Sequence, residues 1–415
     1  MSDTPSKTAA LQPEAWTSSS NEVLKLFITD SSGAHNFPPV FTYPIFGDAE
    51  TIYGYKELVI FLCFDHYTFY PFLNIKYTEK LDDPEIVELK PKLMEFLPES
   101  TVFKDEIEWV DSIKEEKDSY KIPGELYDTF EKEVDGQNSK FDIYKLNLQD
   151  VGGMELHKRL QILALLFIEA GSYIDSSDTL WDVYVLYKQS SDEPSIVGYT
   201  TVYNYWKYPG SEKFDKGELE VRKKISQFII LPTWQGQGLG GEFYSRLFDK
   251  WFISPSVSEV VVEDPNESFD DMRDRCDLEK LNSKINLSLI TTKLDNQWIE
   301  NTRHKYKLEK RQFSRLVEMI LLYKLKNNLG YDTKKDIRVF IKRRLYEKNK
   351  EALNGLEENV RKDKLQTAYE ALEQDYYRIL GDIKLSMKRE IDENNENKKK
   401  QKVWVNELSE LTNER

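Results

Sequence analysis

Cysteine and histidine are scarce in this sequence. Its 415 residues include two cysteines, Cys63 and Cys276, and four histidines. Two cysteines cannot build a disulfide scaffold, which fits a reducing compartment. Because no Cys or His spacing matches the pattern of a zinc site, we expect no metal in the protein.

Long apolar runs and an excess of positive charge are missing as well. No stretch approaches the length of a membrane span, and residues 1–20 lack the apolar core and cleavage pattern of a signal peptide. We therefore expect a soluble intracellular protein with no membrane partner. The formal net charge of −15 argues against binding nucleic acid through the overall field, although it suits a basic substrate. Many soluble proteins without such a substrate are equally acidic.

The chain is long enough for two or three domains, and its pattern changes along its length. Residues 1–14 have the composition of a disordered segment, and residues 15–150 are rich in β-formers. Leu58–Phe64 and Phe72–Tyr77 are expected to form two strands around a turn. Charged helical stretches and loops are expected over 79–150.

Residues 154–280 alternate between helix and strand patterns. Apolar residues at steps of three and four predict a helix over Met154–Ala170. The elements expected after it are strands Trp181–Tyr187, Ile196–Trp206 and Lys224–Leu231, helix Leu239–Phe252, strand Val257–Glu263, and a helix from about Asn266. This order predicts a mixed α/β layer.

From residue 295 onward the sequence is almost entirely helical in character. Apolar residues between 313 and 321 mark one amphipathic helix, and a three–four spacing between 365 and 383 predicts a helical hairpin or a short coiled coil. The basic run Lys398–Lys402 is more typical of a solvated helix end than of a nuclear signal.

The stretch between Ile225 and Gly241 is the most informative in the chain. A strand pattern leads into a loop with glycines at positions 236, 238, 240 and 241, and an amphipathic helix follows directly. Glycines allow a tight turn that points consecutive N–H groups at one spot, and the positive end of the helix dipole points there too. The stretch therefore predicts a pyrophosphate site.

Two cofactor classes fit these glycines. Gly236, Gly238 and Gly241 match the dinucleotide fingerprint G-x-G-x-x-G, with Glu263 roughly 20 positions further on. That interpretation would make the protein an NAD(P)-dependent oxidoreductase. It is disfavoured because Pro232–Gln235 separates the strand from the first glycine, and because one further strand at most follows.

The other class is acetyl-CoA. Gln235–Gly240 matches the pattern Q/R-x-x-G-x-G/A and resembles the loop of the GNAT N-acetyltransferases. Four separate motifs also resemble the catalytic subunit of type B histone acetyltransferases. They are Phe41–Tyr55, Leu166–Ala170, Gly198–Trp206 and Val262–Glu267. The resemblance covers about residues 15–345 and weakens in the tail.

The resemblance implies a GNAT N-acetyltransferase core of mixed α/β type with flanking regions. The implied divisions are a disordered N-terminus (1–14), an N-terminal α/β substrate-groove domain (15–150), an acetyl-CoA-binding catalytic domain (151–285), a helical C-terminal domain (286–345) and a helical or coiled-coil tail (346–415). The implied activity transfers acetyl from acetyl-CoA to lysine ε-amines in the N-terminal tail of newly synthesised histone H4. The same resemblance implies roles in chromatin assembly and DNA repair.

Acetyl transfer to lysine calls for a general base, because only roughly one lysine amine in 10³ is neutral at pH 7. Glu263 stands at the carboxyl end of a predicted strand, where the sites of α/β sheets gather. The resemblance assigns the base to Glu263, with Glu169 and Asp264 as further candidates. The structural alternatives are a helix cap at Asp264, with Pro265 in the first turn, and a solvated helix carboxylate at Glu169.

The resemblance also implies which residues bind acetyl-CoA. The pantetheine arm would follow the strand, the pyrophosphate would bind the loop, and the next helix would complete the site. The residues are Phe228, Ile229, Ile230, Gln235, Gly236, Gln237, Gly238, Leu239, Gly240, Gly241, Asn266 and Arg275. The three strand residues suit an ordinary core equally well, and Arg275 has either the 3′-phosphate or Asp271 as its candidate partner.

Acidic and aromatic residues are the implied contacts to the histone tail: Asp48, Ala49, Glu50, Tyr203, Asn204 and Tyr205. Carboxylates suit a basic, glycine-rich peptide, although an ordinary turn and a tyrosine-rich strand would have the same composition.

The resemblance implies a substrate, a partner and a location. They are the histone H4 tail, presented together with H3, a WD-repeat histone-binding subunit, and both cytoplasm and nucleus. Tyr208–Gly217 is a candidate docking loop for that subunit, or a plain surface hairpin. Because no cysteine lies in the catalytic motifs, we expect direct attack in a ternary complex without a covalent acetyl intermediate. A non-catalytic histone-binding module is the remaining alternative.

Overall fold

The computed structural model describes residues 13–381 and 383–387. The chain divides into two compact units at Asp264 and Pro265. Most of the segment predicted to be disordered, 1–14, lies outside the described residues. Its last two positions belong to a short 3₁₀ turn, η1 (Pro13–Ala15).

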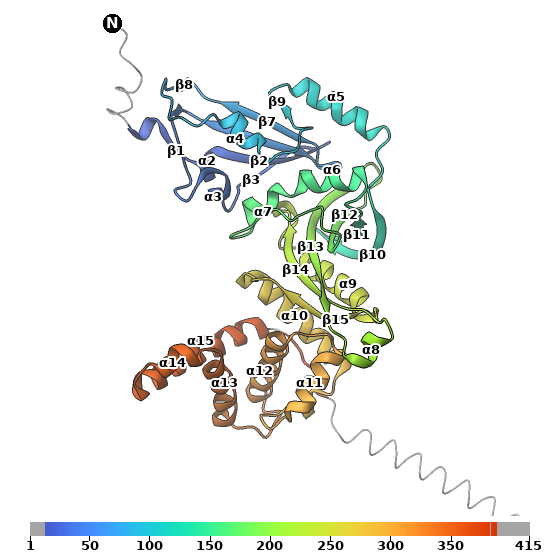
Figure 1. Cartoon of the computed structure of the whole chain (residues 1–415), viewed down its shortest axis with the longest axis vertical. Helices are drawn as coiled ribbons and strands as arrows, with labels where there is room; N and C mark the ends of the chain where they lie inside the picture. Colours follow the sequence, from blue (N-terminus) through green and yellow to red (C-terminus); the bar gives the residue numbers. More distant parts are fainter. Residues whose placement is uncertain (1–12, 382, 388–415) are drawn as a thin grey trace, which may run out of the picture. The chain divides into compact units, whose positions relative to one another are not determined.

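The first unit opens with a five-stranded sheet in the order β3-β2-β6-β7-β9 (Figure 1). Its strands are β2 (Leu24–Asp30), β3 (Gly33–Phe37), β6 (Val59–Asp65), β7 (Pro71–Lys76) and β9 (Val102–Phe103). Strands β6 and β7 are antiparallel around a short turn, which confirms the predicted pair. Also present are two ribbons, β1 (Thr17–Ser19) with β4 (Thr51–Tyr53) and β5 (Tyr55–Lys56) with β8 (Glu79–Lys80), and the helices α2 (Ser20–Val23), α3 (Tyr43–Phe46), α4 (Leu89–Met94) and α5 (Glu106–Lys117).

A six-stranded sheet follows in the same unit, in the order β10-β11-β12-β13-β14-β15. Its strands are β10 (Glu125–Val134), β11 (Gln137–Leu146), β12 (Trp181–Lys188), β13 (Ser195–Lys207), β14 (Glu220–Ile230) and β15 (Val257–Val262). All neighbours are antiparallel except β14 and β15, which are parallel. Helix α9 (Leu239–Ile253) makes the crossover between that pair, and α8 (Ser211–Asp215) lies between β13 and β14. This is the predicted mixed α/β layer.

Strands β10 and β11 fall where the sequence predicted charged helices and loops, so that prediction was wrong over this stretch. Along β10, Phe130 and Val134 are buried, whereas Glu131 and Glu133 are exposed. An edge strand with one solvated face carries as many charges as an exposed helix does. Only the alternation of buried and exposed residues with a period of two distinguishes such a strand from an exposed helix.

The helix predicted over Met154–Ala170 is two helices, α6 (Val151–Leu160) and α7 (Ile162–Phe167). Helix α7 ends because Ile168 is extended and Ala170 has a left-handed φ of 54°. Glu169 therefore lies in a turn, and the predicted position on a helix was wrong.

Helices α7 and α9 cover opposite faces of the six-stranded sheet. Successive residues of a strand point to opposite faces. Ile229 of β14 belongs to the buried cluster that includes Leu163 and Leu166 of α7. Its neighbour Phe228 packs against Phe243 of α9, with ring centroids 5.3 Å apart. Strand β14 is thus anchored between two helix layers.

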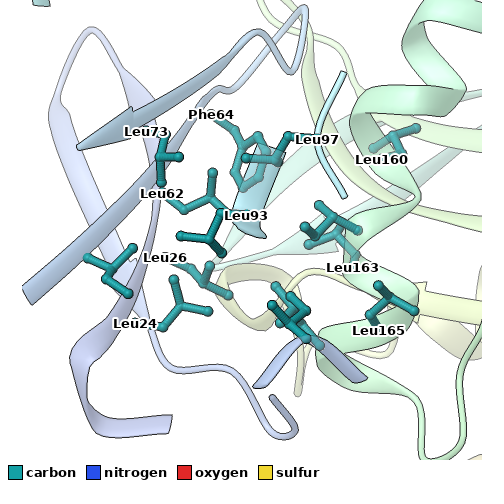
Figure 2. Close-up of a cluster of buried hydrophobic side chains, with 14 of the residues drawn as sticks. Leu24, Leu26, Leu62, Phe64, Leu73, Leu93, Leu97, Leu160, Leu163 and Leu165 are labelled. Carbon is teal, nitrogen blue, oxygen red and sulfur yellow. The ribbon is translucent and has the colours of Figure 1, made fainter. Parts of the chain in front are cut away.

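One hydrophobic core joins the two sheets of the first unit. Figure 2 shows leucines from β2, β6 and β7 beside leucines that belong to α6 and α7, such as Leu160 and Leu163. The same cluster includes Val183 and Val185 of β12. Because full burial of a leucine contributes about 1.5–3 kcal/mol, this shared core holds the five-stranded sheet against the six-stranded one.

The second unit is helical, as predicted. Its elements are α10 (Glu267–Lys284), η3 (Leu287–Leu289), α11 (Asn296–Lys305), α12 (Lys310–Lys326), α13 (Lys334–Lys348), α14 (Lys350–Asn354) and α15 (Glu358–Leu380). The predicted hairpin or coiled coil over 365–383 is instead a single helix, α15, packed on α12 and α13. Buried ion pairs hold this bundle: Arg315 binds Asp274, and Arg344 binds Glu318. The run Lys398–Lys402 lies outside the described residues.

His157 on α6 is a buried polar group without compensation. It is 1% exposed, and within the described residues neither ring nitrogen has a hydrogen-bond partner. Burial lowers the pKa of His157 from 6.5 to about 4, because the charged ring cannot be solvated. Below pH 6.5 the unfolded chain binds a proton that the folded chain does not, so stability falls as the pH drops toward 4.

We expect His157→Leu to remove this acid sensitivity. At pH 5 the difference in free energy of unfolding should reach about 2 kcal/mol in favour of the variant, after correction for any difference at pH 8. Urea unfolding at both pH values measures it, with the exposed His35→Leu as a matched control. Parallel stability–pH curves for wild type and His157→Leu would contradict this account.

Candidate active site

Strands β14 and β15 are paired over only part of their length. The parallel register runs from Val221↔Val257 to Ile225↔Val262, and the Glu263 N–H still donates to the Ile225 carbonyl at 2.9 Å. Beyond this point β14 continues to Ile230, where β13 is its paired strand among the described residues. The two strands therefore part at Glu263, and the β14 edge beyond it is available to an extended ligand.

The glycine loop lies at the far end of this edge. After a 3₁₀ turn, η2 (Pro232–Trp234), Gly236 and Gly238 adopt left-handed φ values of 78° and 71°. Gly238 is the N-cap of α9 and provides no side-chain cap, so the first turn of the helix faces the loop. A Cβ atom on Gly236 would meet nothing within 4 Å, so the space beside the loop is open.

The predicted loop residues are therefore together in space. Gln235 braces the loop, because its side-chain amide donates to the Ile230 carbonyl at 2.8 Å. Leu239, Gly240 and Gly241 form the first turn of α9. Left-handed glycines at a helix N-terminus fit a pyrophosphate, because helix dipole and backbone N–H groups favour negative charge at the same place.

A lysine that the sequence did not point to lies beside this loop. A Cβ atom on Gly238 would lie 3.3 Å from the Nζ of Lys132, which comes from β10. Helix α9 lies along β10, since Lys250 pairs with Asp128 at 3.2 Å. Lys132 adds a positive charge beside the loop, which favours an anionic ligand there. Its contribution depends on sheet topology, and no local pattern announced it.

Glu263, the first residue after β15, is held at the point where the strands part. Its side chain is 41% exposed, and the carboxylate accepts hydrogen bonds from Lys224 Nζ at 2.5 Å and from the Ser226 hydroxyl. Burial acts to raise the pKa of Glu263, but these two hydrogen bonds outweigh it and lower the pKa. The carboxylate is therefore ionised at neutral pH, the form that can accept a proton.

The two other predicted carboxylates are placed differently. Asp264 is exposed and has a left-handed φ of 34°. The prediction that Asp264 caps the next helix was wrong, because the Asn266 side chain caps α10 by accepting from Phe269 N at 2.9 Å. Glu169 is exposed in the turn after α7.

That turn joins two predicted parts of the site. The Tyr43 hydroxyl accepts a hydrogen bond from the Ala170 N–H, which ties the loop containing Asp48 to the turn containing Glu169. The Gln227 side chain of β14 donates to the Ser172 carbonyl at 2.7 Å. The structure therefore brings the 41–50 loop, the Glu169 turn and β14 together.

Within the 41–50 loop the acidic residues differ. Asp48 and Ala49 are exposed. Glu50 instead organises the loop: its carboxylate accepts from Thr42 N at 2.7 Å and from the Asn21 side chain at 2.7 Å. The backbone hydrogen bond from Thr42 is the main cause of the lowered pKa of Glu50. Asp48 is thus better placed than Glu50 for a substrate contact.

The predicted tyrosines form an aromatic row that leads to Glu263. Ring centroids are 4.9 Å apart for Trp181 and Tyr203, and 4.8 Å apart for Tyr203 and Tyr205. Lys224 Nζ lies 5.2 Å from the Tyr205 ring centroid. Asn204 serves the sheet instead, since its amide donates to the Leu180 carbonyl at 2.8 Å and to Asp182 at 3.0 Å.

Two predicted CoA-binding residues belong to the second unit. Asn266 caps α10, as described above. The Arg275 side chain donates to the Ile379 carbonyl at 3.2 Å, while Asp271 is paired with Arg378. Of the two partners considered for Arg275, the carboxylate of Asp271 is therefore engaged elsewhere.

Two findings apply to the described residues alone. Within 13–381 and 383–387, no group of three or more His, Cys, Asp or Glu side chains is arranged to hold a metal ion. None of the helices in the same residues has both the length and the apolar character needed to cross a bilayer.

Comparison with family models matches residues 16–169 to the N-terminus of the histone acetyl transferase HAT1, and residues 274–326 to the C-terminal part of fungal HAT1. The chain is 64% identical over 409 residues to the histone acetyltransferase type B catalytic subunit of Candida albicans, covering 96% of this chain and 98% of that protein. For the subunit of Debaryomyces hansenii the identity is 59% over 405 residues, covering 96% and 97%. Among solved structures, an aminoglycoside acetyltransferase from a soil metagenomic sample matches 32% of this chain and 83% of its own, with 20% identity and a TM-score of 0.24.

The parted strands, the glycine loop and the helix behind it define an acetyltransferase. The end-to-end identity to curated relatives places the chain, more narrowly, in the family of histone acetyltransferase type B catalytic subunits. This membership decides against the dinucleotide and non-catalytic alternatives, and it implies acetyl-CoA as co-substrate.

The position of Lys132 leads to a direct test of the cofactor site. A charge-assisted hydrogen bond is worth about 1.5–3 kcal/mol, so Lys132→Met should raise KM for acetyl-CoA about tenfold or more and leave kcat nearly unchanged. Initial rates over a range of acetyl-CoA concentrations measure this. The matched control is Lys140→Met, which removes an exposed lysine from the neighbouring strand β11. The same KM for both variants would exclude Lys132 from the site.

Proposed function

We propose that the protein acetylates lysine ε-amines in the N-terminal tail of newly synthesised histone H4, by direct attack in a ternary complex with Glu263 as general base. The observation that carries the proposal is the position of the Glu263 carboxylate, held by Lys224 at the point where β14 and β15 part. A thioester whose pantetheine follows the β14 edge would present its carbonyl near this carboxylate.

The chemistry then requires two proton transfers and one displacement. The acceptor ammonium gives its proton to Glu263, and the neutral amine attacks the thioester carbonyl. The C–N bond forms, the C–S bond breaks, and the CoA thiolate leaves and takes up the second proton, which the amine nitrogen loses as the amide forms. A backbone N–H of β14 beyond Ile225 can stabilise the oxyanion that develops, since the register of β14 with β15 ends at Ile225 and Val262.

The positions of the cysteines favour direct transfer. Cys63 lies on β6 of the N-terminal sheet, and burial raises the pKa of its thiol to about 12. A thiol with so high a pKa is a poor nucleophile at neutral pH. Cys276 lies on α10 of the second unit. Neither supports a covalent acetyl intermediate.

A basic tail suits the groups around Glu263. Asp48 and Glu169 are exposed carboxylates on neighbouring loops, and the row Trp181–Tyr203–Tyr205 offers aromatic faces to lysine and glycine backbone. Aromatic faces attract ammonium groups, and carboxylates pair with them. These groups support a histone tail as substrate and favour no particular lysine.

The proposal is tested by acetylation of H4 and H3 tail peptides, followed by mass spectrometry. We expect faster transfer to the H4 peptide, and a loss of about 10²–10⁴ in kcat for Glu263→Gln, with KM for acetyl-CoA unchanged. Glu169→Gln is the matched control on a second candidate and should lose far less. Equal rates on both peptides would remove the H4 assignment, and full activity of Glu263→Gln would remove the base.

We also propose that a WD-repeat histone-binding subunit docks on the loop Tyr208–Gly217. Three exposed aromatic residues lie in this loop or beside it: Trp206 at the end of β13, and Tyr208 and Phe214 in the loop, with ring centroids 6.2 Å and 5.6 Å apart along the row. Exposed aromatic clusters are typical of protein interfaces.

Replacing Tyr208 and Phe214 by serine should abolish co-purification with that subunit and spare acetylation of a free peptide. Retained co-purification would contradict the docking site. Residence in cytoplasm and nucleus stays a prediction.

A further inference from the structure

Lys224 makes contacts that an acceptor lysine would also need. Its Nζ donates to Oε1 of Glu263 at 2.5 Å and lies 5.2 Å from the ring centroid of Tyr205. The carboxylate and the aromatic ring are both on the expected path of the substrate. Lys224 lies on β14 directly before Ile225, the last β14 residue paired with β15. The Lys224 ammonium therefore lies at the point where the pairing of β14 with β15 ends.

The carboxylate retains room for a second cation. Lys224 binds one oxygen of Glu263, and the Ser226 hydroxyl binds the other. A carboxylate offers about four lone-pair sites, so these two donors leave about half of its accepting capacity. With 41% of the Glu263 side chain exposed, an incoming ammonium can reach it without displacing Lys224.

Among the described residues, few other charged or titratable groups lie around Lys224. From β13, Tyr205 faces it across the ring contact and Tyr203 is its cross-strand partner. The Tyr203 hydroxyl donates to Asp178 at 2.9 Å, so that carboxylate is already engaged. Glu263 remains the anion in direct contact with Lys224. Burial acts to lower the pKa of Lys224, and hydrogen bonds to Glu263 and Tyr205 outweigh it, so Lys224 stays charged through neutral pH.

We propose that Lys224 is a positioning residue that shares the Glu263 carboxylate with the acceptor ammonium and drives that ammonium to lose its proton. Two cations at one carboxylate repel each other, and a lysine beside another cation loses its proton more readily. Lys224 keeps its proton because it donates to Glu263 and lies against Tyr205, so the acceptor is the amine that becomes neutral, and its proton passes through Glu263 to water. The inference rests on the proposed role of Glu263 as the base.

The test is the pH profile of kcat for Lys224→Met, measured from pH 6 to pH 10 with saturating H4 peptide and acetyl-CoA. Loss of the neighbouring charge should move the rising limb of the profile to higher pH by about one unit. At pH 7 kcat should then fall about tenfold, and the difference should disappear at high pH. KM for the peptide should fall, because one repulsive charge is gone.

Two further variants make the test decisive. Lys224→Arg keeps the charge and should retain the wild-type limb, whereas a variant with only a packing defect would lose rate equally at every pH. Lys362→Met removes a lysine that is paired with Glu358 in α15 and controls for net charge. Thermal unfolding and CoA affinity confirm that each variant is folded.

Failure of this inference is distinguishable from failure of the base assignment. If the rising limb of the pH profile of kcat is the same for Lys224→Met and wild type while Glu263→Gln is inactive, Lys224 does not promote deprotonation of the acceptor. Glu263 then remains the base. If Glu263→Gln retains full activity, the base assignment and the role of Lys224 are both overturned.

Discussion

The incomplete pairing of β14 and β15 is the constraint on which the rest of the site depends. A parallel pair that stayed in register to its end would satisfy every backbone group and leave no place for an extended cofactor. Here the pairing ends at Ile225 and Val262. Where this pairing ends, the β14 edge becomes available to a ligand. Glu263 lies at the start of that edge, and the glycine loop lies at its far end. The cofactor path and the candidate base are therefore products of one feature of the sheet.

The remainder of the first unit holds β14 in the position at which it separates from β15. Helix α7 packs on one face of β14 through Ile229, and α9 packs on the other through Phe228. The Gln227 side chain ties β14 to the Ser172 carbonyl after α7. Because the N-terminal sheet shares one core with α7, and the Phe41 N–H donates to the Leu166 carbonyl, its 41–50 loop is fixed against α7. The candidate substrate-binding residues are distant in sequence, and they are positioned by the same hydrophobic core.

Local patterns predicted the parts of the fold that have a strong period or a distinctive loop. The glycines at 236 and 238, the strands β12 to β15 and helix α9 could all be predicted from the sequence.

Strands β10 and β11 were missed because their charged, solvated faces conceal the alternation. Lys132 could not have been found, since its place beside Gly238 depends on α9 lying along β10. The ion pair of Lys224 with Glu263 likewise joins two strands that only the tertiary register brings together. Asp264 was misjudged as a cap because Asn266, two residues later, competes for the same role and makes the hydrogen bond.

The most direct test of the account is amide hydrogen exchange of the whole protein with and without acetyl-CoA. The parted edge and the loop predict slower exchange on binding at 227–230 and 235–241, with little change in the five-stranded N-terminal sheet. Protection confined to other segments, or none at 227–230 despite saturating acetyl-CoA, would show that the cofactor does not bind along β14 and would contradict the central claim.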